Sequence, residues 1–128
     1  MASTDLGLRS RNQGRADYRV SKIADSAISL VFPTDYDFTG WTAVLTIRAE
    51  ADSTALLTIT DTESAEGSVV SFANNIIGLL LKAGDLVTLP DDAGDDSAPW
   101  VGVWDLTITD TDELTTRLLA GVFIAEKR

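Results

Sequence analysis

The sequence contains neither cysteine nor histidine. Without cysteine, the chain cannot form disulfides, thiolate metal sites or a cysteine nucleophile. Without histidine, it lacks the imidazole of a Ser-His-Asp triad and the most common general acid–base group. These two absences remove the side chains that most hydrolases use, and we expect a protein that is not an enzyme.

Basic residues are also scarce, with 10 Lys plus Arg against 20 Asp plus Glu and a net charge of −10. Because phosphate binding depends on Lys and Arg, nucleic acid is not expected as the primary partner.

The longest apolar run covers only residues 76–81, whereas a membrane span needs about 20 residues. Residues 1–5 lack the basic and apolar regions of a signal peptide. The sequence therefore predicts a soluble protein made in the cytoplasm, with no membrane partner.

The few basic residues are concentrated near the N-terminus. Residues 1–22 hold five basic and two acidic side chains, whereas residues 23–126 hold three basic and eighteen acidic ones. Residues 1–16 contain few large apolar side chains, so we expect an N-terminal arm at 1–17, flexible or partner-bound, before one domain at 18–128. A bound arm would contact the acidic body of a neighbouring copy. The candidate contact residues are Arg9, Arg11, Arg15 and Arg19.

Beyond the arm, apolar and polar residues alternate with the period of two that is typical of half-buried strands. In residues 41–48, one face carries only apolar side chains: Trp41, Ala43, Leu45 and Ile47. Turn-forming clusters separate strand starts that recur roughly every 8–14 residues, which favours an antiparallel arrangement over βαβ units. We expect an all-β domain, an antiparallel β-sandwich of about seven or eight strands, with one helical turn near residues 83–89. The expected strands are 18–23, 27–32, 41–48, 55–60, 68–72, 75–81, 100–108 and 117–124.

Three positions carry specific structural expectations. Gly40 leads into a strand through a turn that favours a permissive φ. Asp105 lies between two residues of an apolar face, so it points outward, to solvent or to a basic neighbour such as Arg48 or Arg117. Gly121 interrupts a strand, which indicates a bulge or a close neighbouring backbone.

The densest acidic cluster holds four carboxylates within residues 91–96. Carboxylate oxygens suit a hard cation, but this cluster lacks the alternating acids and closing Glu of an EF-hand loop. A solvated, self-repelling loop accounts for the same residues, so we assign no metal and no cofactor. The other loop acids lie in expected turns and show no spacing that predicts a catalytic pair.

Tryptophan suggests a second hypothesis. Exposed aromatic rings on a β-sandwich can stack against sugars. Trp41 and Trp104 fall on apolar strand faces and are expected in the core, whereas Trp100 follows Pro99 at a strand start and is placed at a rim. The alternative function is therefore a carbohydrate- or ligand-binding module with Trp100 and the loop at 90–99 as its site.

Three segments resemble a known family. Residues 37–48 (DFTGWTAVLTIR) are similar to a D-L-T-G-Y-T-A-x-x-x-I-R signature, residues 104–110 (WDLTITD) to Y-D-L-x-I-x-D, and residues 117–123 (RLLAGVF) to R-L-L-x-G-x-F. In series they resemble small virion proteins of tailed bacteriophages over residues 18–126. The chain departs from that pattern in its ending, Glu126-Lys127-Arg128 rather than T-R, and in a longer, more acidic loop at 91–98.

The resemblance implies an immunoglobulin-like β-sandwich with a structural role in a bacteriophage virion. Such proteins include baseplate or tail-fibre attachment domains and head-associated proteins. We therefore expect an attachment, adaptor or decoration module at the tail, neck or capsid surface. Its partners would be other virion structural proteins, including copies of itself, and its location would be the virion.

Overall fold

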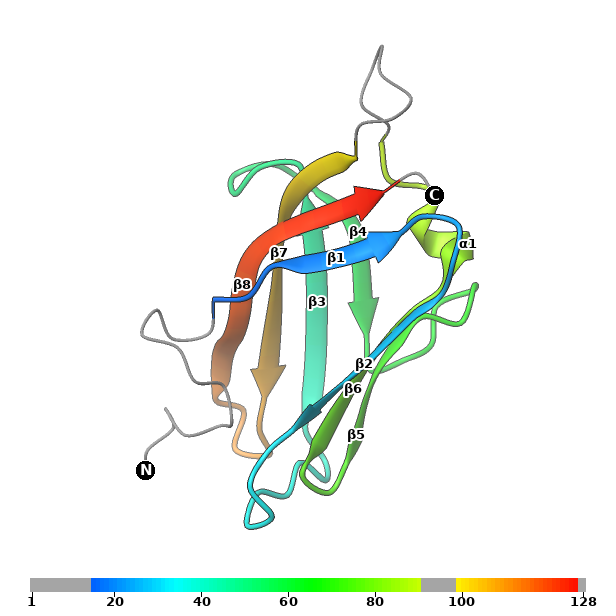
Figure 1. Ribbon diagram of the computed structural model, residues 1–128. Coiled ribbons are helices and arrows are strands. Elements are labelled where there is room, and N and C mark those ends of the chain that lie inside the picture. The colour runs from blue at the N-terminus through cyan, green and yellow to red at the C-terminus, as the bar shows by residue number, and fades with distance from the viewer. Residues whose placement is uncertain (1–14, 91–98, 127–128) are drawn as a thin grey trace.

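The computed structural model describes residues 15–90 and 99–126, which form two β-sheets packed face to face (Figure 1). The larger sheet has the order β1-β8-β7-β3-β4 and the smaller one the order β2-β6-β5. All paired strands are antiparallel except β1 and β8, which run parallel. The bounds are β1 (Tyr18–Ser21), β2 (Ser26–Val31), β3 (Thr42–Arg48), β4 (Ala55–Thr60), β5 (Val69–Ala73), β6 (Ile76–Leu81), β7 (Trp100–Thr109) and β8 (Thr115–Glu126). The predicted all-β sandwich is confirmed.

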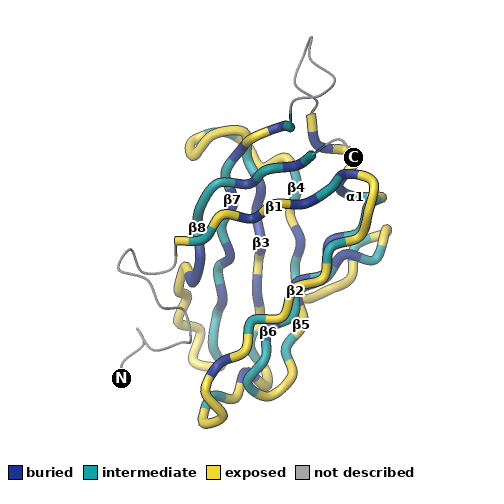
Figure 2. The backbone as a smooth tube through the Cα atoms, viewed as in Figure 1, coloured by how far each residue is buried: buried dark blue, intermediate teal, exposed yellow. Residues whose placement is uncertain are grey.

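The inward faces of β3 and β7 form the centre of the core (Figure 2). In β3, the alternating residues Ala43, Leu45 and Ile47 are buried, as predicted. In β7, every second residue from Trp100 to Ile108 is buried. Because each fully buried large apolar side chain stabilises the fold by about 1.5–3 kcal/mol, this alternation fixes which face of the sheet points inward. The same alternation leaves the intervening residues of both strands on the outer face.

β2 is less buried than its sequence predicts. Phe32, which directly follows the strand, is buried, but Ile28 is 38% exposed and Leu30 is only half-buried. Within the described residues β2 pairs only with β6, so it forms an edge of the smaller sheet. The expected apolar face is therefore covered only in part, because an edge strand has a neighbour on one side alone.

Four described residues have a positive φ: Gly40, Gly67, Asn74 and Glu113. Gly40 has a φ of 86°, which confirms the expected need for a permissive residue before β3. In the β7–β8 turn, Glu113 has a φ of 66°. The Oδ1 atom of Asp110 accepts hydrogen bonds from the backbone N–H groups of Asp112 (2.8 Å) and Leu114 (3.0 Å). These bonds hold the tip of the β7–β8 hairpin in one shape.

The helical turn expected near residues 83–89 is present as α1 (Ala83–Leu86). Its one buried residue, Leu86, docks this turn against the core. No helix in the described part of the chain has both the length and the apolar character needed to cross a membrane.

Candidate functional site

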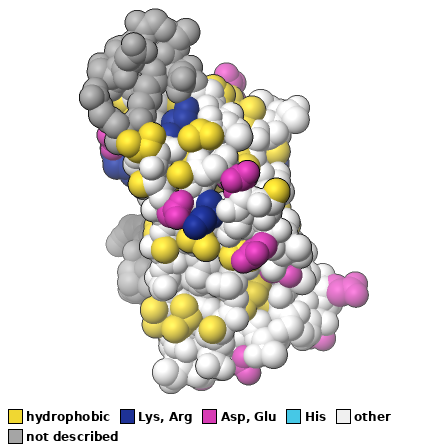
Figure 3. All heavy atoms as spheres, turned by 90° about the vertical axis from the view of Figure 1, so that its right-hand side faces the viewer, with side chains coloured by type: hydrophobic (Ala, Val, Ile, Leu, Met, Phe, Trp, Pro, Cys, Tyr) yellow, Lys and Arg dark blue, Asp and Glu magenta, His cyan; other side chains and the backbone are white. Residues whose placement is uncertain are grey.

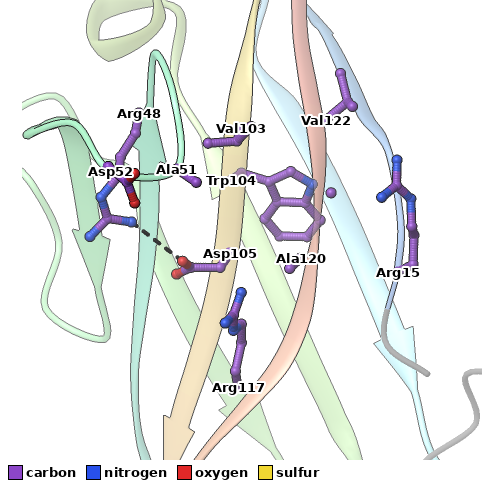
Figure 4. Close-up of a pocket in the computed structure, with 11 residues that line it drawn as sticks. Arg15, Arg48, Ala51, Asp52, Val103, Trp104, Asp105, Arg117, Ala120 and Val122 are labelled. Atoms are coloured by element: carbon purple, nitrogen blue, oxygen red, sulfur yellow. Dashed lines mark hydrogen bonds and ion pairs between the residues drawn. The ribbon is translucent and has the colours of Figure 1, made fainter. Parts of the chain in front are cut away.

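A hollow of about 980 Å³ lies on the outer face of the larger sheet (Figure 4). Val103 of β7 and Ala120 and Val122 of β8 contribute apolar side chains to its floor. The end of β3 and the β3–β4 turn form one side, and residues just before β1 form the other. The strand order β1-β8-β7-β3 therefore assembles the hollow from segments that are far apart in the sequence.

Three arginines surround this hollow, which we call the arginine hollow. Arg15 precedes β1, Arg48 ends β3 and Arg117 lies near the start of β8. The acidic side chains that line it are Asp52 and Asp105. In a chain with a net charge of −10, a surface on which arginines outnumber acids is suited to a negatively charged partner.

An ion pair crosses the floor of the arginine hollow. The Nη1 atom of Arg48 lies 3.3 Å from the Oδ2 atom of Asp105. Asp105 is directly opposite Thr46, so Arg48 reaches it diagonally between two paired strands. The expected outward position of Asp105 and its basic partner are confirmed. Arg117 also points toward Asp105 (Figure 4) but forms no ion pair within the described residues.

The position of Arg15 depends on a close approach between two backbones. The N–H of Ala16 donates to the carbonyl of Ala120 (2.9 Å), and the carbonyl of Ala16 accepts from the indole Nε1 of Trp104 (2.8 Å). Any Cβ on Gly121 would collide with the carbonyl of Ala16. The expected close neighbouring backbone at Gly121 is thus confirmed, and residues 15–17 lie against β8.

The sequence-predicted contact residues fall in different places. Arg9 and Arg11 lie outside the described residues. Arg15 lines the arginine hollow. Arg19, on the edge strand β1, pairs with Glu126 of β8 at 2.7 Å and does not line the hollow.

The expectation that Trp100 reaches a rim is wrong. Its side chain is 8% exposed, and its ring lies over Gly102, the next residue on the same face of β7. Because Gly102 has no side chain, the indole can fold inward. Trp100 therefore offers little ring surface to a sugar. Trp104 is buried as predicted, and Trp41 is half-buried against Phe38, with ring centroids 4.9 Å apart.

Two acidic residues in the described loops, Asp37 and Asp110, stabilise their own turns. The Oδ1 atom of Asp37 accepts from the N–H (3.0 Å) and hydroxyl (2.7 Å) of Thr39, and these bonds lower the pKa of Asp37. Asp110 holds the β7–β8 turn in a similar way. No group of three or more potential metal ligands occurs in the described ranges. The acidic cluster at 91–96 lies outside them.

Charge is distributed unevenly over the molecule. Viewed from the side that carries α1 (Figure 3), acidic side chains are spread over the surface and basic ones are few. The outer face of the larger sheet differs, because it combines the arginine hollow with the exposed side chains of Val44 and Val101, which are 40% and 55% exposed. Such a mixture of apolar and arginine side chains is common where proteins bind each other.

The sequence matches no protein-family model and no curated protein sequence. Among solved structures, extracellular domains of the voltage-gated sodium channel beta4 subunit are similar, with a TM-score of 0.51 and 10% identity over 94% of this chain and 98% of theirs. A second structure, from work on cell-adhesive interactions of sodium channel beta subunits, has a TM-score of 0.50 and 11% identity over 94% and 99%. The fold is immunoglobulin-like. At 10–11% identity, this similarity shows the fold of the immunoglobulin-like domain and not its function.

Sequence reasoning did not identify Arg48 and Arg117 as site residues. A signal was present, since residues 23–126 contain only three basic side chains and two of them line the hollow. Only the order of the strands in the sheet shows that Arg48 and Arg117 line the same hollow. In this immunoglobulin-like domain Arg48 and Arg117 lie on strands separated by β7, and no local pattern encodes that arrangement.

Proposed function

We propose that the chain is a non-enzymatic, immunoglobulin-like binding module that acts as a structural protein of a bacteriophage virion. It would serve as an attachment, adaptor or decoration module at the tail, neck or capsid surface. Its partners are other virion proteins and copies of itself, bound mainly through the outer face of the larger sheet. After synthesis in the host cytoplasm, it would reside in the virion.

One observation carries this proposal: each of the three family-like segments contributes one charged residue to the arginine hollow. Arg48 ends the first segment, Asp105 belongs to the second and Arg117 begins the third. The three segments lie on the adjacent strands β3, β7 and β8. Core packing accounts for the apolar residues of these segments, but it does not require two arginines and an aspartate on the outer face. A shared binding surface would give all three a common role.

The solved structures support the general class of this function. The sodium channel beta4 domains form parallel homodimers that explain a role in cell–cell adhesion, and the related work concerns multimeric cell-adhesive interactions. Those proteins use a similar fold to bind copies of themselves. For the present chain, assembly through a sheet face is consistent with its lack of histidine and cysteine and with loop acids that stabilise turns.

The test is whether the protein is part of an assembled particle. Particles from the strain that encodes the chain are purified by density gradient, and their proteins are quantified by mass spectrometry. We expect several copies of the chain per particle, retained after a salt wash. Immunogold labelling then assigns it to head, neck or tail. Absence of the chain from intact, infectious particles would contradict the virion role.

A further inference from the structure

The tip of the β7–β8 hairpin combines acidic and apolar side chains on an exposed surface. Asp112 and Glu113 are exposed, and Leu114 is 66% exposed. The tip lies at the end of the larger sheet opposite α1 (Figure 1). The two hydrogen bonds accepted by Asp110 hold this tip in one conformation. A rigid loop loses little conformational entropy when it binds, so the tip is suited to insertion into a partner.

The arginine hollow has the complementary chemistry. Arg117 and Arg15 can pair with carboxylates, since a guanidinium and a carboxylate form charge-assisted, often bidentate hydrogen bonds. Arg15 already has an exposed neighbour, Asp17, but at 3.8 Å this contact is weak. Between the arginines, Val103 and Val122 offer an apolar floor. The floor suits a side chain such as Leu114.

We propose that the hairpin tip of one copy, Asp112 to Leu114, docks into the arginine hollow of a second copy. This inference rests on the proposed function, because it names the partner and the contact through which copies assemble. A copy cannot fill its own hollow, since β7 and β8 form the floor and the tip lies at their far end. Two copies related by a two-fold axis would exchange tips, so each tip–hollow contact would occur twice.

The experiment measures self-association of purified full-length protein by sedimentation equilibrium in low salt. The hollow variant is Arg117→Glu and the tip variant is Asp112→Lys with Glu113→Lys. Each alone should weaken association by at least about tenfold, because like charges then face each other. An equimolar mixture of the two should recover association to within about threefold of the native protein, since one native contact and one charge-reversed contact form in each mixed pair.

Matched controls separate this contact from the effect of charge alone. Thr62→Glu with Ala65→Glu changes the net charge by the same −2 as the hollow variant, in the exposed β4–β5 connection, and Asp35→Lys places a lysine in an exposed turn. Both should leave association within about twofold. Circular dichroism and thermal unfolding confirm that every variant is folded, which is expected because all substituted residues are exposed.

Several outcomes would overturn the inference. One is a native protein that remains monomeric at about 1 mM, the upper range of weak association. A second is a mixture of hollow and tip variants that stays as weak as each variant alone. A third is loss of association when Asp91, Asp92, Asp95 and Asp96 are changed to Asn while the tip variant still associates, which would make that loop the occupant. The proposed virion role is tested separately, by the presence of the chain in purified particles. Any of these three results would leave that test unaffected.

Discussion

Gly121 illustrates how a single residue shapes both the core and the candidate site. At its position, the carbonyl of Ala16 occupies the space that a side chain would need. That carbonyl satisfies the buried indole N–H of Trp104, and the neighbouring N–H donates to Ala120. Arg15 directly precedes Ala16 in the sequence. By letting Ala16 approach β8, Gly121 therefore also places one of the three arginines beside the hollow.

Gly121→Ala should therefore lower the free energy of unfolding by about 1–3 kcal/mol, because two backbones must separate to admit one methyl group. Urea unfolding followed by tryptophan fluorescence measures the loss and reports the changed environment of Trp104. Gly84→Ala is the control: the nearest atoms to its new Cβ belong to the Glu66 side chain, which can rotate away. Its effect should stay within about 0.5 kcal/mol. Equal losses in both variants would contradict this role of Gly121.

Phe38 is a second residue with a large expected effect. It is fully buried and makes edge-on ring contacts with Phe32 and Trp41, at centroid distances of 5.0 and 4.9 Å. Phe38→Ala should cost about 3–5 kcal/mol of unfolding free energy, since it removes a large core side chain and leaves a cavity. Leu56→Ala on β4, where the side chain is 42% exposed, should cost less than about 1 kcal/mol. Chemical denaturation of both variants checks the difference.

Among the elements, α1 is held by a side chain from the connection between β1 and β2. The Oδ1 atom of Asp25 accepts the backbone N–H of Ala83 at 2.9 Å, and its Oδ2 atom lies 2.9 Å from the Nζ atom of Lys82. Both hydrogen bonds lower the pKa of Asp25 below its ordinary value of 3.8, and the bond from the Ala83 N–H has a larger effect than the bond from Lys82. The same pair raises the pKa of Lys82 above its ordinary value.

This linkage gives a prediction with a definite sign. Because the pKa of Asp25 is lower in the folded state than in the unfolded state, its stabilising effect is complete above pH 3.8 and declines as the pH falls through the folded value. Asp25→Asn should therefore reduce the dependence of unfolding free energy on pH below 3.8. Denaturant titrations between pH 2 and pH 6 measure this. Asp35→Asn, an exposed turn variant, is the control, and identical pH profiles for both variants would contradict the assignment.

On the scale of the whole molecule, the domain is an acidic sandwich with one surface where arginines gather. Contacts between copies therefore depend on opposite charges meeting across an interface, and on Val44 and Val101 adding apolar area on the same face. Electrostatic contacts of this kind direct which surfaces meet, and salt weakens them because exposed charges are screened over about 8 Å at physiological ionic strength.

We expect self-association of the native protein to weaken by about tenfold between 0.05 and 0.5 M NaCl. Arg117→Gln should show a smaller salt dependence, because it removes one charge from the hollow without reversing it. Sedimentation equilibrium across the salt series measures both. The Asp35→Asn variant, in an exposed turn, should retain the native salt dependence. Association that strengthens steadily with salt would indicate an apolar contact instead.

The features that the sequence predicts are those that depend on neighbouring residues. Alternation in β3 and β7 predicts which side chains are buried and that Asp105 faces outward, and both are confirmed. The position of Trp100 was predicted wrongly because its burial depends on the space above Gly102, which a strand pattern does not reveal. The pairing of Tyr18 with Phe123 joins opposite ends of the domain. Local periodicity carries no information about such a pairing, and for that reason the arginine hollow could not be predicted.

The parallel pairing of β1 with β8 also has a consequence during protein synthesis. Residues 18–21 are among the first of the domain to leave the ribosome, yet their partners, residues 123–126, are among the last. Until then, β7 has only β3 as an antiparallel neighbour, and Tyr18 has no β8 strand to hold it against Trp104. The larger sheet is therefore completed only after translation reaches Glu126, and the place of β8 between β1 and β7 stays empty until then.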